Sequence, residues 1–288
     1  MNSMLKLSKM IFKERFKAGR MMVIWPLLFV FILFSTWGLS DPKANLPASL
    51  TIDSAYDVMY ASTAFIIFSA TMGAVLISFD GISRDRMTGV LELKLSQPIN
   101  RTHSAIALVL GHSTAIIIPV ITLNFLAIFI IRYRMGEFPG FDEFFIHLIG
   151  TALLLLWWTT IQLLASTWTK DVGASIAIGL GTWMVFTLLW LVLTSLIAGL
   201  MGIGVNDTNS LEYINLEAII DLFSPNGVYH HLLEMPLENV ERNLSPIWIS
   251  LAAILWSLVP IGLLVRRIYC GSTHPHFKWL YLGFMGCI

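Results

Sequence analysis

The chain has 288 residues, of which 56% are hydrophobic and only 12% are charged, and its 18 basic and 18 acidic residues cancel to a net charge of zero. Together with a mean hydropathy of +0.75, this composition excludes an ordinary soluble domain, in which about a quarter of the residues are charged. The composition also lacks the basic excess that nucleic-acid binding needs. We therefore expect an integral membrane protein with no nucleic-acid partner.

The first 20 residues form a basic arm ahead of the first long apolar run. Leu5, Phe12 and Phe16 recur at spacings of seven and four, while the lysines and arginines occupy other faces. This pattern predicts an amphipathic interface helix with Phe12 and Phe16 on its apolar face. Two roles remain open: an anchor drawn to the anionic headgroups of the lipid bilayer, or an elbow helix that also touches a cytoplasmic partner.

Six long runs without Asp, Glu, Lys or Arg make up most of residues 21–288. A helix rises about 1.5 Å per residue, so about 20 apolar residues cross a hydrocarbon core of about 30 Å. Continuous runs of this kind predict an all-α polytopic membrane protein with a single transmembrane domain, because β-barrel strands would instead alternate over about ten residues. The predicted spans are residues 21–40, 58–79, 102–131, 144–169, 172–205 and 246–265.

The basic residues are distributed unevenly between the two sides that six spans define. Fourteen of the 18 lie in the arm, in residues 80–101, at Lys170 and in the carboxyl-terminal tail. The opposite loops hold four bases and 13 of the 18 acids. Because basic residues collect on the cytoplasmic side of membrane proteins, we predict a multi-pass protein of the cell membrane with both termini in the cytoplasm.

Residues 80–101, between the second and third spans, combine charges with an apolar stripe that a purely solvated loop would not need. The stripe consists of Met87, Val90, Leu91 and Leu95. These positions fit one helical face, although residues 90–95 also show some alternation with period two. We expect a helix that Gly89 and Pro98 bound or bend.

The same segment resembles the cytoplasmic signature of type-2 ABC transporter permeases, in which it joins the second and third spans. The resemblance lies in the order acid, Ile-Ser, Arg-Asp-Arg, Thr-Gly, Leu-Glu-Leu, Leu-Ser, Pro and Arg. The matching residues are Asp80, Ile82, Ser83, Arg84, Asp85, Arg86, Thr88, Gly89, Leu91, Glu92, Leu93, Leu95, Ser96, Pro98 and Arg101. Two positions depart from the family pattern: Asp85 stands where Glu is commoner, and Lys94 stands where an apolar residue is commoner.

The resemblance implies the membrane permease subunit of an ABC exporter, which forms the translocation path and pairs with a second permease copy, identical or related. It also implies a separate ATPase subunit that binds ATP and Mg²⁺. This chain has no G-x-x-x-x-G-K-S/T phosphate loop, so we expect no catalytic residue and no cofactor bound by it. The residues implied in coupling to the ATPase are Arg84, Asp85, Arg86, Met87, Val90, Leu91, Glu92 and Leu95, with Lys170 and Asp171 as a second contact.

The segment 206–245, before the last span, carries seven acids and one base. An apolar helical face within it comprises Leu216, Ile219, Ile220 and Phe223. We expect this segment to lie against the membrane or to form re-entrant helices, as in type-2 permeases. The uncharged run 172–205 would be about 51 Å long as one helix, so we expect a break near Gly199, Gly202 or Gly204.

Polar side chains within the spans are candidates for the translocation path, although hydrogen bonding between helices is their commoner role. These candidates are His112, Asn124 and Gln162. Zinc-ligand residue types also occur together at His230, His231 and Glu234. The motifs H-E-x-x-H and H-x-x-E-H are both absent, and adjacent histidines on a helix point in different directions, so we expect no metal site there.

Three other function classes fit the sequence less well than the permease. An ion-coupled secondary transporter places ionisable groups near the membrane midplane, and the predicted spans contain no Asp, Glu, Lys or Arg. An intramembrane enzyme needs a nucleophile and base, or a metal cluster, at one depth, and no such pattern is visible. A membrane adaptor without an ATPase partner would leave the apolar stripe of residues 80–101 without a purpose.

Overall fold

The computed structural model describes residues 2–41, 52–91, 94, 100–204, 210–237 and 244–270, and every regular element in these ranges is a helix. Six helical units are long and apolar enough to cross a membrane, which confirms the predicted all-α fold with six spans. The units are α2–η1–α3 (Met21–Phe29, Val30–Phe34, Ser35–Leu39), α4 (Ala55–Ser78), α7 (Arg101–Met135), α8 (Phe141–Trp168), α9–η2–α10 (Val172–Met184, Val185–Leu189, Trp190–Leu200) and α13 (Pro246–Cys270).

Several of these helices extend beyond the uncharged runs from which they were predicted, because capping side chains set their ends. The Ser54 hydroxyl accepts a hydrogen bond from the Asp57 backbone N–H at 3.1 Å, and the Asp57 carboxylate accepts one from the Ser54 N–H at 2.8 Å. This reciprocal cap begins α4 three residues before the predicted span. At the end of α7, Gly136 adopts a φ of 83°, a conformation that glycine adopts without steric cost and that terminates helices.

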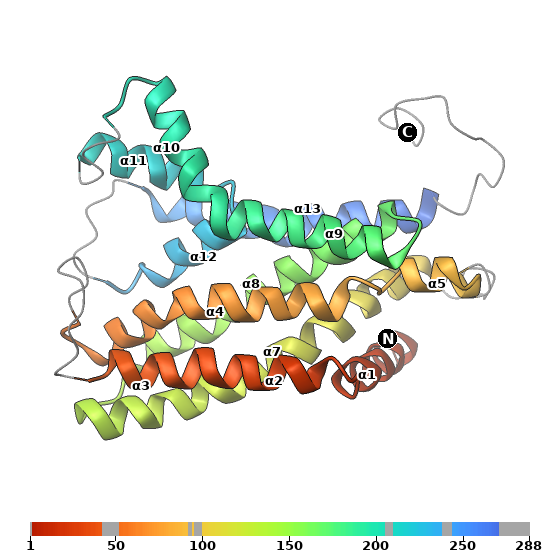
Figure 1. The fold of residues 1–288 in the computed structure, drawn as a ribbon, viewed down its shortest axis with the longest axis horizontal. Helices are drawn as coiled ribbons and strands as arrows, with labels where there is room; N and C mark the ends of the chain where they lie inside the picture. Colours follow the sequence, from red (N-terminus) through yellow and green to blue (C-terminus); the bar gives the residue numbers. More distant parts are fainter. Residues whose placement is uncertain are drawn as a thin grey trace.

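The long helices run along a common direction, and the shorter helices gather at the two ends of the bundle (Figure 1). At one end lie α1 (Asn2–Phe16), α5 (Ser83–Met87), residues 169–171 and the carboxyl end of α13. We call this the basic end. At the opposite end lie α10 and α11 (Leu211–Asp221).

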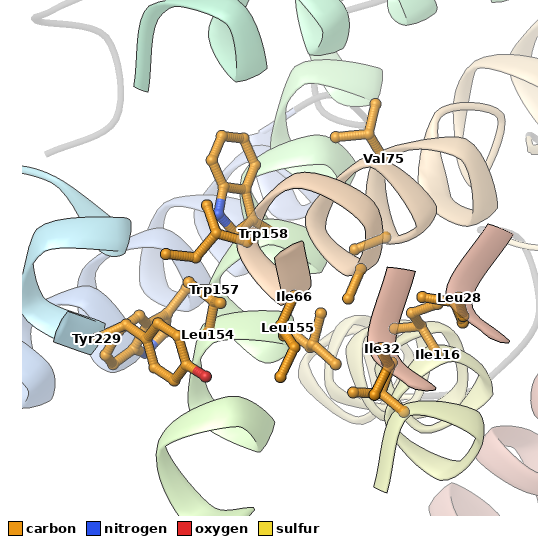
Figure 2. Close-up of a cluster of buried hydrophobic side chains, with 14 of the residues drawn as sticks. Leu28, Ile32, Ile66, Val75, Ile116, Leu154, Leu155, Trp157, Trp158 and Tyr229 are labelled. Carbon is orange, nitrogen blue, oxygen red and sulfur yellow. The ribbon is translucent and has the colours of Figure 1, made fainter. Parts of the chain in front are cut away.

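The main core joins α2, η1, α4, α7, α8 and α12 (Pro225–Leu233), and Figure 2 shows its large aliphatic and aromatic side chains. Two adjacent tryptophans of α8 fix the helices around them. The Trp157 indole N–H donates to Ser257 Oγ at 2.8 Å, and the Trp158 indole N–H donates to Asn226 Oδ1 at 2.9 Å. Because a buried indole N–H needs a partner, these bonds hold α13 and α12 in defined positions against α8.

The spans differ in how much of their surface the chain itself covers. In the most hydrophobic 18-residue window of each span, 72% of α4 is buried, against 11% for α9–η2–α10 and 22% each for α2–η1–α3 and α13. The three poorly covered spans therefore present broad apolar faces outside this chain. Such faces are expected where a helix meets lipid or another membrane subunit.

The predicted break in the fifth span lies where the glycines occur. Helix α10 ends at Leu200, and Gly202 adopts a φ of 75°. Helices α11 and α12 then precede the last span. Helix α11 buries Tyr213 and Ala218, whereas Ile219 and Phe223 of the predicted apolar face are exposed, as expected of a face turned toward lipid.

Candidate functional site

A buried ion-pair cluster at the basic end joins the amino-terminal arm to the carboxyl end of α4. The Asp80 carboxylate has no solvent exposure and contacts three guanidinium groups. Its oxygens lie 2.5 Å from Arg15 Nη1, 2.6 Å from Arg20 Nη2 and 3.4 Å from Arg84 Nε. Arg20 also donates to the backbone oxygen of Leu76 at 2.7 Å. A carboxylate shared in this way fixes the geometry of the arm and of residues 80–91 together.

The segment after Asp80 is also bonded to the α8–α9 connection. The backbone N–H groups of Ile82 and Ser83 both donate to Ser166 Oγ, at 3.1 and 2.8 Å. The Arg86 guanidinium donates to the backbone oxygen of Thr169 at 2.5 Å. Helix α5 is therefore held on one side by the arm and on the other by the end of α8, so these elements at the basic end form one connected unit.

Helix α1 packs tightly on α7, and its apolar face is turned toward protein. An added Cβ at Gly111 would lie 2.6 Å from a side-chain carbon of Ile11 and 3.0 Å from the Ser8 backbone oxygen, so the close approach requires glycine. The rings of Phe12 and Phe16 lie 5.3 Å apart and pack against the main core. The predicted apolar face thus contacts the bundle, while Leu5, farther toward the amino terminus, remains exposed.

Two predicted coupling residues present apolar surface outside the chain. The side chain of Met87 is 60% exposed and that of Val90 is 37% exposed. Leu91 differs, because it packs with Leu108 and Ile268 against a buried cluster that includes Leu163. Its substitution would therefore disturb internal packing as well as any contact with a partner.

The predicted single helical face across residues 87–95 is interrupted in the structure. Helix α5 ends at Met87, and Gly89 adopts a φ of 72°. This left-handed backbone conformation changes the direction of the chain before Val90, so the stripe does not lie along one continuous helix. Two predicted coupling residues, Glu92 and Leu95, lie outside the described residues.

The predicted orienting charges make contacts within the chain. Arg84 contacts Asp80, Arg86 contacts the Thr169 backbone, and Asp85 lies 2.5 Å from Lys94 Nζ. In the neighbouring turn, the Asp171 carboxylate accepts a hydrogen bond from the Ala174 N–H at 2.7 Å and caps α9, while Lys170 is exposed. Arg84, Arg86, Asp85 and Asp171 therefore all contact groups within the chain, and the side chains of Arg84 and Lys94 are each 57% exposed.

The three candidates for a translocation path are all buried within the chain, at separate places. His112 lies at the basic end, where its Nδ1–H donates to the Leu108 backbone oxygen at 2.8 Å. Asn124 is three turns farther along α7, a distance of about 18 Å. Gln162 donates to the Ser175 backbone oxygen at 3.1 Å and faces Gly179. The structure does not bring the three side chains together, and their role in transport stays a prediction.

The histidine pair at the opposite end is used in packing. His231 Nε2 lies 3.1 Å from the Ala218 backbone oxygen, and His231 Nδ1 lies 3.3 Å from Glu234 Oε2. Glu234 also accepts a hydrogen bond from the Tyr60 hydroxyl at 2.6 Å. Within the described ranges, no three His, Cys, Asp or Glu residues gather as a metal site would require.

Sequence reasoning identified the segment but missed the residues that hold it in place. The sequence marks Arg15 and Arg20 only as basic residues of the arm, and Asp80 only as part of the family signature. The sequence does contain a signal for this ion pair. Asp80 directly follows 22 uncharged residues, and a buried acid at such a position must meet a cation. The sequence did not show which of the six bases in the arm would supply it.

Comparison with known protein families identifies the family of the chain. No curated protein matches the chain. The family model described as ABC-2 family transporter protein matches residues 4–267, a range that includes most of the arm, the Asp80 cluster, the first five spans and nearly all of the sixth. Because that match extends over nearly the whole sequence, the chain belongs to the ABC-2 family of transporter proteins.

Proposed function

We propose that this chain is the membrane subunit of an ATP-driven exporter, with its basic end and both termini in the cytoplasm. A separate ATPase subunit would bind ATP and Mg²⁺ and would dock on Met87, Val90 and the turn at residues 169–171. The observation that carries this proposal is that exposed apolar side chains occur on residues 80–91. The start of this segment is held against the arm by the buried carboxylate of Asp80.

The contacts around α5 support a role in transmitting movement. A partner that displaces α5 would pull on Arg15 and Arg20 through Asp80, and on the α8–α9 connection through Arg86 and Ser166. Both effects would occur together because packed, hydrogen-bonded elements shift between discrete arrangements more readily than they deform continuously. Nucleotide-driven closure of two ATPase subunits would thereby alternate the transport path between its two states.

A second permease copy and the lipid bilayer are the proposed occupants of the uncovered faces of α9–η2–α10 and α13. The low burial of these two spans supports this assignment. Crosslinking of the purified chain in lipid nanodiscs should capture a dimer, and a wholly monomeric population in the active complex would contradict the pairing.

The docking surface is tested by a matched pair of substitutions, Met87→Asp and Met235→Asp. Both methionines are exposed, but Met235 follows α12, which packs near the amino end of α4 through the Tyr56–Leu233 hydrogen bond. A charge placed in an apolar partner groove costs about 3 kcal/mol or more, which is at least about a 150-fold loss of affinity. ATPase recovery with the tagged chain should fall for Met87→Asp and not for Met235→Asp.

Equal recovery with both variants would exclude Met87 from the contact. Recovery of the permease without any ATPase, even from the wild type in mild detergent, would favour the secondary-transporter or adaptor alternatives. Mass spectrometry of the co-purified proteins and an ATPase assay on the complex provide these readouts.

The proposed transmission of movement from α5 to the α8–α9 connection is tested separately from ATPase docking by the substitution Arg86→Gln. This change removes the charged donor to the Thr169 backbone oxygen and leaves Met87 and Val90 in place. We expect the ATPase to co-purify normally while transport per ATP hydrolysed decreases. Unchanged coupling in this variant would show that the bond from α5 to the α8–α9 connection is not used to transmit movement.

A further inference from the structure

The fifth span contains a π turn, η2, between α9 and α10. In a π turn the backbone N–H groups bond carbonyls five residues back instead of four. The turn therefore holds one more residue than an α-helix needs, and one carbonyl loses its donor within the helix. At the end of η2, Leu189 has a φ of −96° and a ψ of −7°, against about −63° and −42° in an α-helix. The span also changes direction between α9 and α10 (Figure 1).

The support for this turn comes from a different helix. The side-chain amide of Asn226, at the start of α12, donates to the Phe186 backbone oxygen at 3.0 Å and to Thr187 Oγ1 at 3.2 Å. Its oxygen accepts the indole N–H of Trp158 at 2.9 Å. Asn226 is only 6% exposed, so one buried side chain joins the π turn to both α12 and α8.

The Phe186 side chain is enclosed as well. Its ring centroid lies 6.2 Å from that of Trp158, 5.1 Å from that of Trp190 and 6.0 Å from that of Trp256. These tryptophans belong to the fourth, fifth and sixth spans. Both the backbone and the ring of Phe186 are therefore held from outside η2.

The same tryptophans bond the corner between α11 and α12. The indole N–H of Trp190 donates to Asp221 Oδ1 at 2.8 Å, and that of Trp256 donates to the Leu222 backbone oxygen at 3.1 Å. With the bond from Trp158 to Asn226, three spans contact residues 221–226. The position of this corner is thus linked directly to the surroundings of the π turn.

The π turn of the first span, η1, is supported differently. Its Ile32 backbone oxygen accepts a hydrogen bond from Thr36 Oγ1 at 2.7 Å, and the Ser35 hydroxyl bonds the Phe31 backbone oxygen. These donors lie on the same span, whereas η2 takes its donor from α12. The state of η2, unlike that of η1, therefore depends on where another helix lies.

We propose that Asn226 is a latch that holds the fifth span in its π turn, and that displacement of α12 lets the turn become α-helical. The extra residue would then rotate α10 by about 100° and advance it by about 1.5 Å relative to α9. Because the Ser195 and Tyr213 hydroxyls lie 3.1 Å apart, α11 would follow α10. The switch lies within this chain and needs no ATPase, so it can hold or fail independently of the proposed function.

A pair of single-residue deletions tests whether η2 holds an extra residue. Leu188 is exposed, and its deletion should leave a continuous α-helix in which α9 and α10 keep their orientations. We expect an unfolding midpoint within about 5 °C of the wild type. Deletion of Ile178, an exposed residue of α9, is the control. It must displace Ser175 or Trp183, which both bond α4, and should lower the midpoint by at least about 10 °C.

The orientation of α10 is measured with a cysteine at position 194. Thr194 is buried, and its hydroxyl has no hydrogen-bond partner among the described residues, so Thr194→Cys should be tolerated. In a full chain that carries Cys270→Ser and Cys287→Ser, the rate of modification by N-ethylmaleimide, followed by mass spectrometry, reports exposure of this position. Asn226→Leu should raise the rate at least about tenfold. The same substitution in the chain that lacks Leu188 should leave the rate unchanged.

Two neighbouring tryptophans supply a matched pair of substitutions, which also serves if Asn226→Leu does not fold. Trp158→Phe removes the donor to Asn226, whereas Trp157→Phe removes the donor to Ser257 of α13. Both tryptophans are fully buried, so the loss of packing is similar. Modification at position 194 should become at least about threefold faster with Trp158→Phe and should not change with Trp157→Phe.

Three results would overturn the proposal. Equal losses of unfolding midpoint in the two deletion variants would show that η2 has no residue to spare. An unchanged modification rate with Asn226→Leu, or with Trp158→Phe where Asn226→Leu does not fold, would show that Asn226 does not set the orientation of α10. A rate increase from Asn226→Leu that persists without Leu188 would assign the effect to a general loosening of the bundle.

Discussion

Replacing Asp80 by asparagine would remove a buried negative charge that Arg15, Arg20 and Arg84 share, while leaving the size of the side chain almost unchanged. Arg15 would suffer most, because only 9% of its side chain is exposed, against 22% for Arg20 and 57% for Arg84. The asparagine carbonyl oxygen could still accept one hydrogen bond. The guanidinium charges would nevertheless remain close together at one site without the carboxylate.

Removing one partner from a buried ion pair typically costs about 3–5 kcal/mol. The remaining carbonyl acceptor and the partial exposure of Arg20 favour the lower part of that range, about 3 kcal/mol. At about 2–4 °C for each kcal/mol in chains of 150–250 residues, the midpoint of thermal unfolding should fall by roughly 10 °C. A change of this size is large enough to measure in detergent.

Asp85→Asn is the matched control, since it makes the same substitution five residues along the same segment. Its ion pair with Lys94 is largely exposed, so the loss should be about 0–1 kcal/mol. Thermal unfolding followed by intrinsic fluorescence, with 10 tryptophans in the chain, gives both midpoints. A midpoint for Asp80→Asn within about 2 °C of Asp85→Asn would refute the view that the Asp80 cluster holds the arm and α4 together.

Three further substitutions test packing and titration elsewhere in the bundle. Gly111→Ala should destabilise the chain by about 1–3 kcal/mol, because the added methyl would lie 2.6 Å from the nearest side-chain carbon of α1. Limited proteolysis should then cleave α1 more readily than in the wild type. An unchanged cleavage rate would contradict the close packing of α1 on α7. Gly179→Ala should cost about 1 kcal/mol, because its Cβ would collide with the Gln162 amide, which must then shift away from the Ser175 backbone oxygen that it bonds at 3.1 Å. Gly181→Ala, with no atom within 4 Å, should be neutral or stabilising by up to about 1 kcal/mol. Equal unfolding midpoints for the two α9 variants would sink this reasoning. Partial burial raises the pKa of Glu217 above its ordinary value of 4.5. Between the pKa of the unfolded chain and that of the folded chain, the unfolded chain binds fewer protons, so stability falls as the pH rises through that window. Glu217→Gln should abolish this part of the pH dependence, and a pH profile of the unfolding midpoint identical to that of the wild type would contradict the role of Glu217.

The connected contacts at the basic end bear on how substitutions there should be interpreted. Met87 and Val90 are exposed, so changes at these positions test contact with a partner. Asp80 and Leu91 are engaged inside the chain, so changes there disturb the support of the same segment. Loss of transport alone would not separate the two kinds of effect. Measurements of ATPase association and of thermal unfolding on the same variants distinguish them.

Composition and local order determined the class, the fold and the family of this protein. Uncharged runs of about 20 residues can satisfy their backbone polar groups in a membrane only as helices, so the number of spans followed directly from the sequence. The order of residues from Asp80 to Arg101 indicated the family because the signature is contiguous. The break at the end of α10 was also predictable, since it depends on a local run of glycines.

The contacts between distant segments were decided only by the tertiary structure. Arg15 and Arg20 precede Asp80 by 65 and 60 residues, and their meeting depends on how α1 folds back onto α7 at Gly111. Leu91 shares the apolar character of Met87 and Val90, but the turn at Gly89 directs it toward the buried cluster around Leu163. Helical periodicity describes which residues share a face, whereas the direction of that face depends on how the helices pack around it.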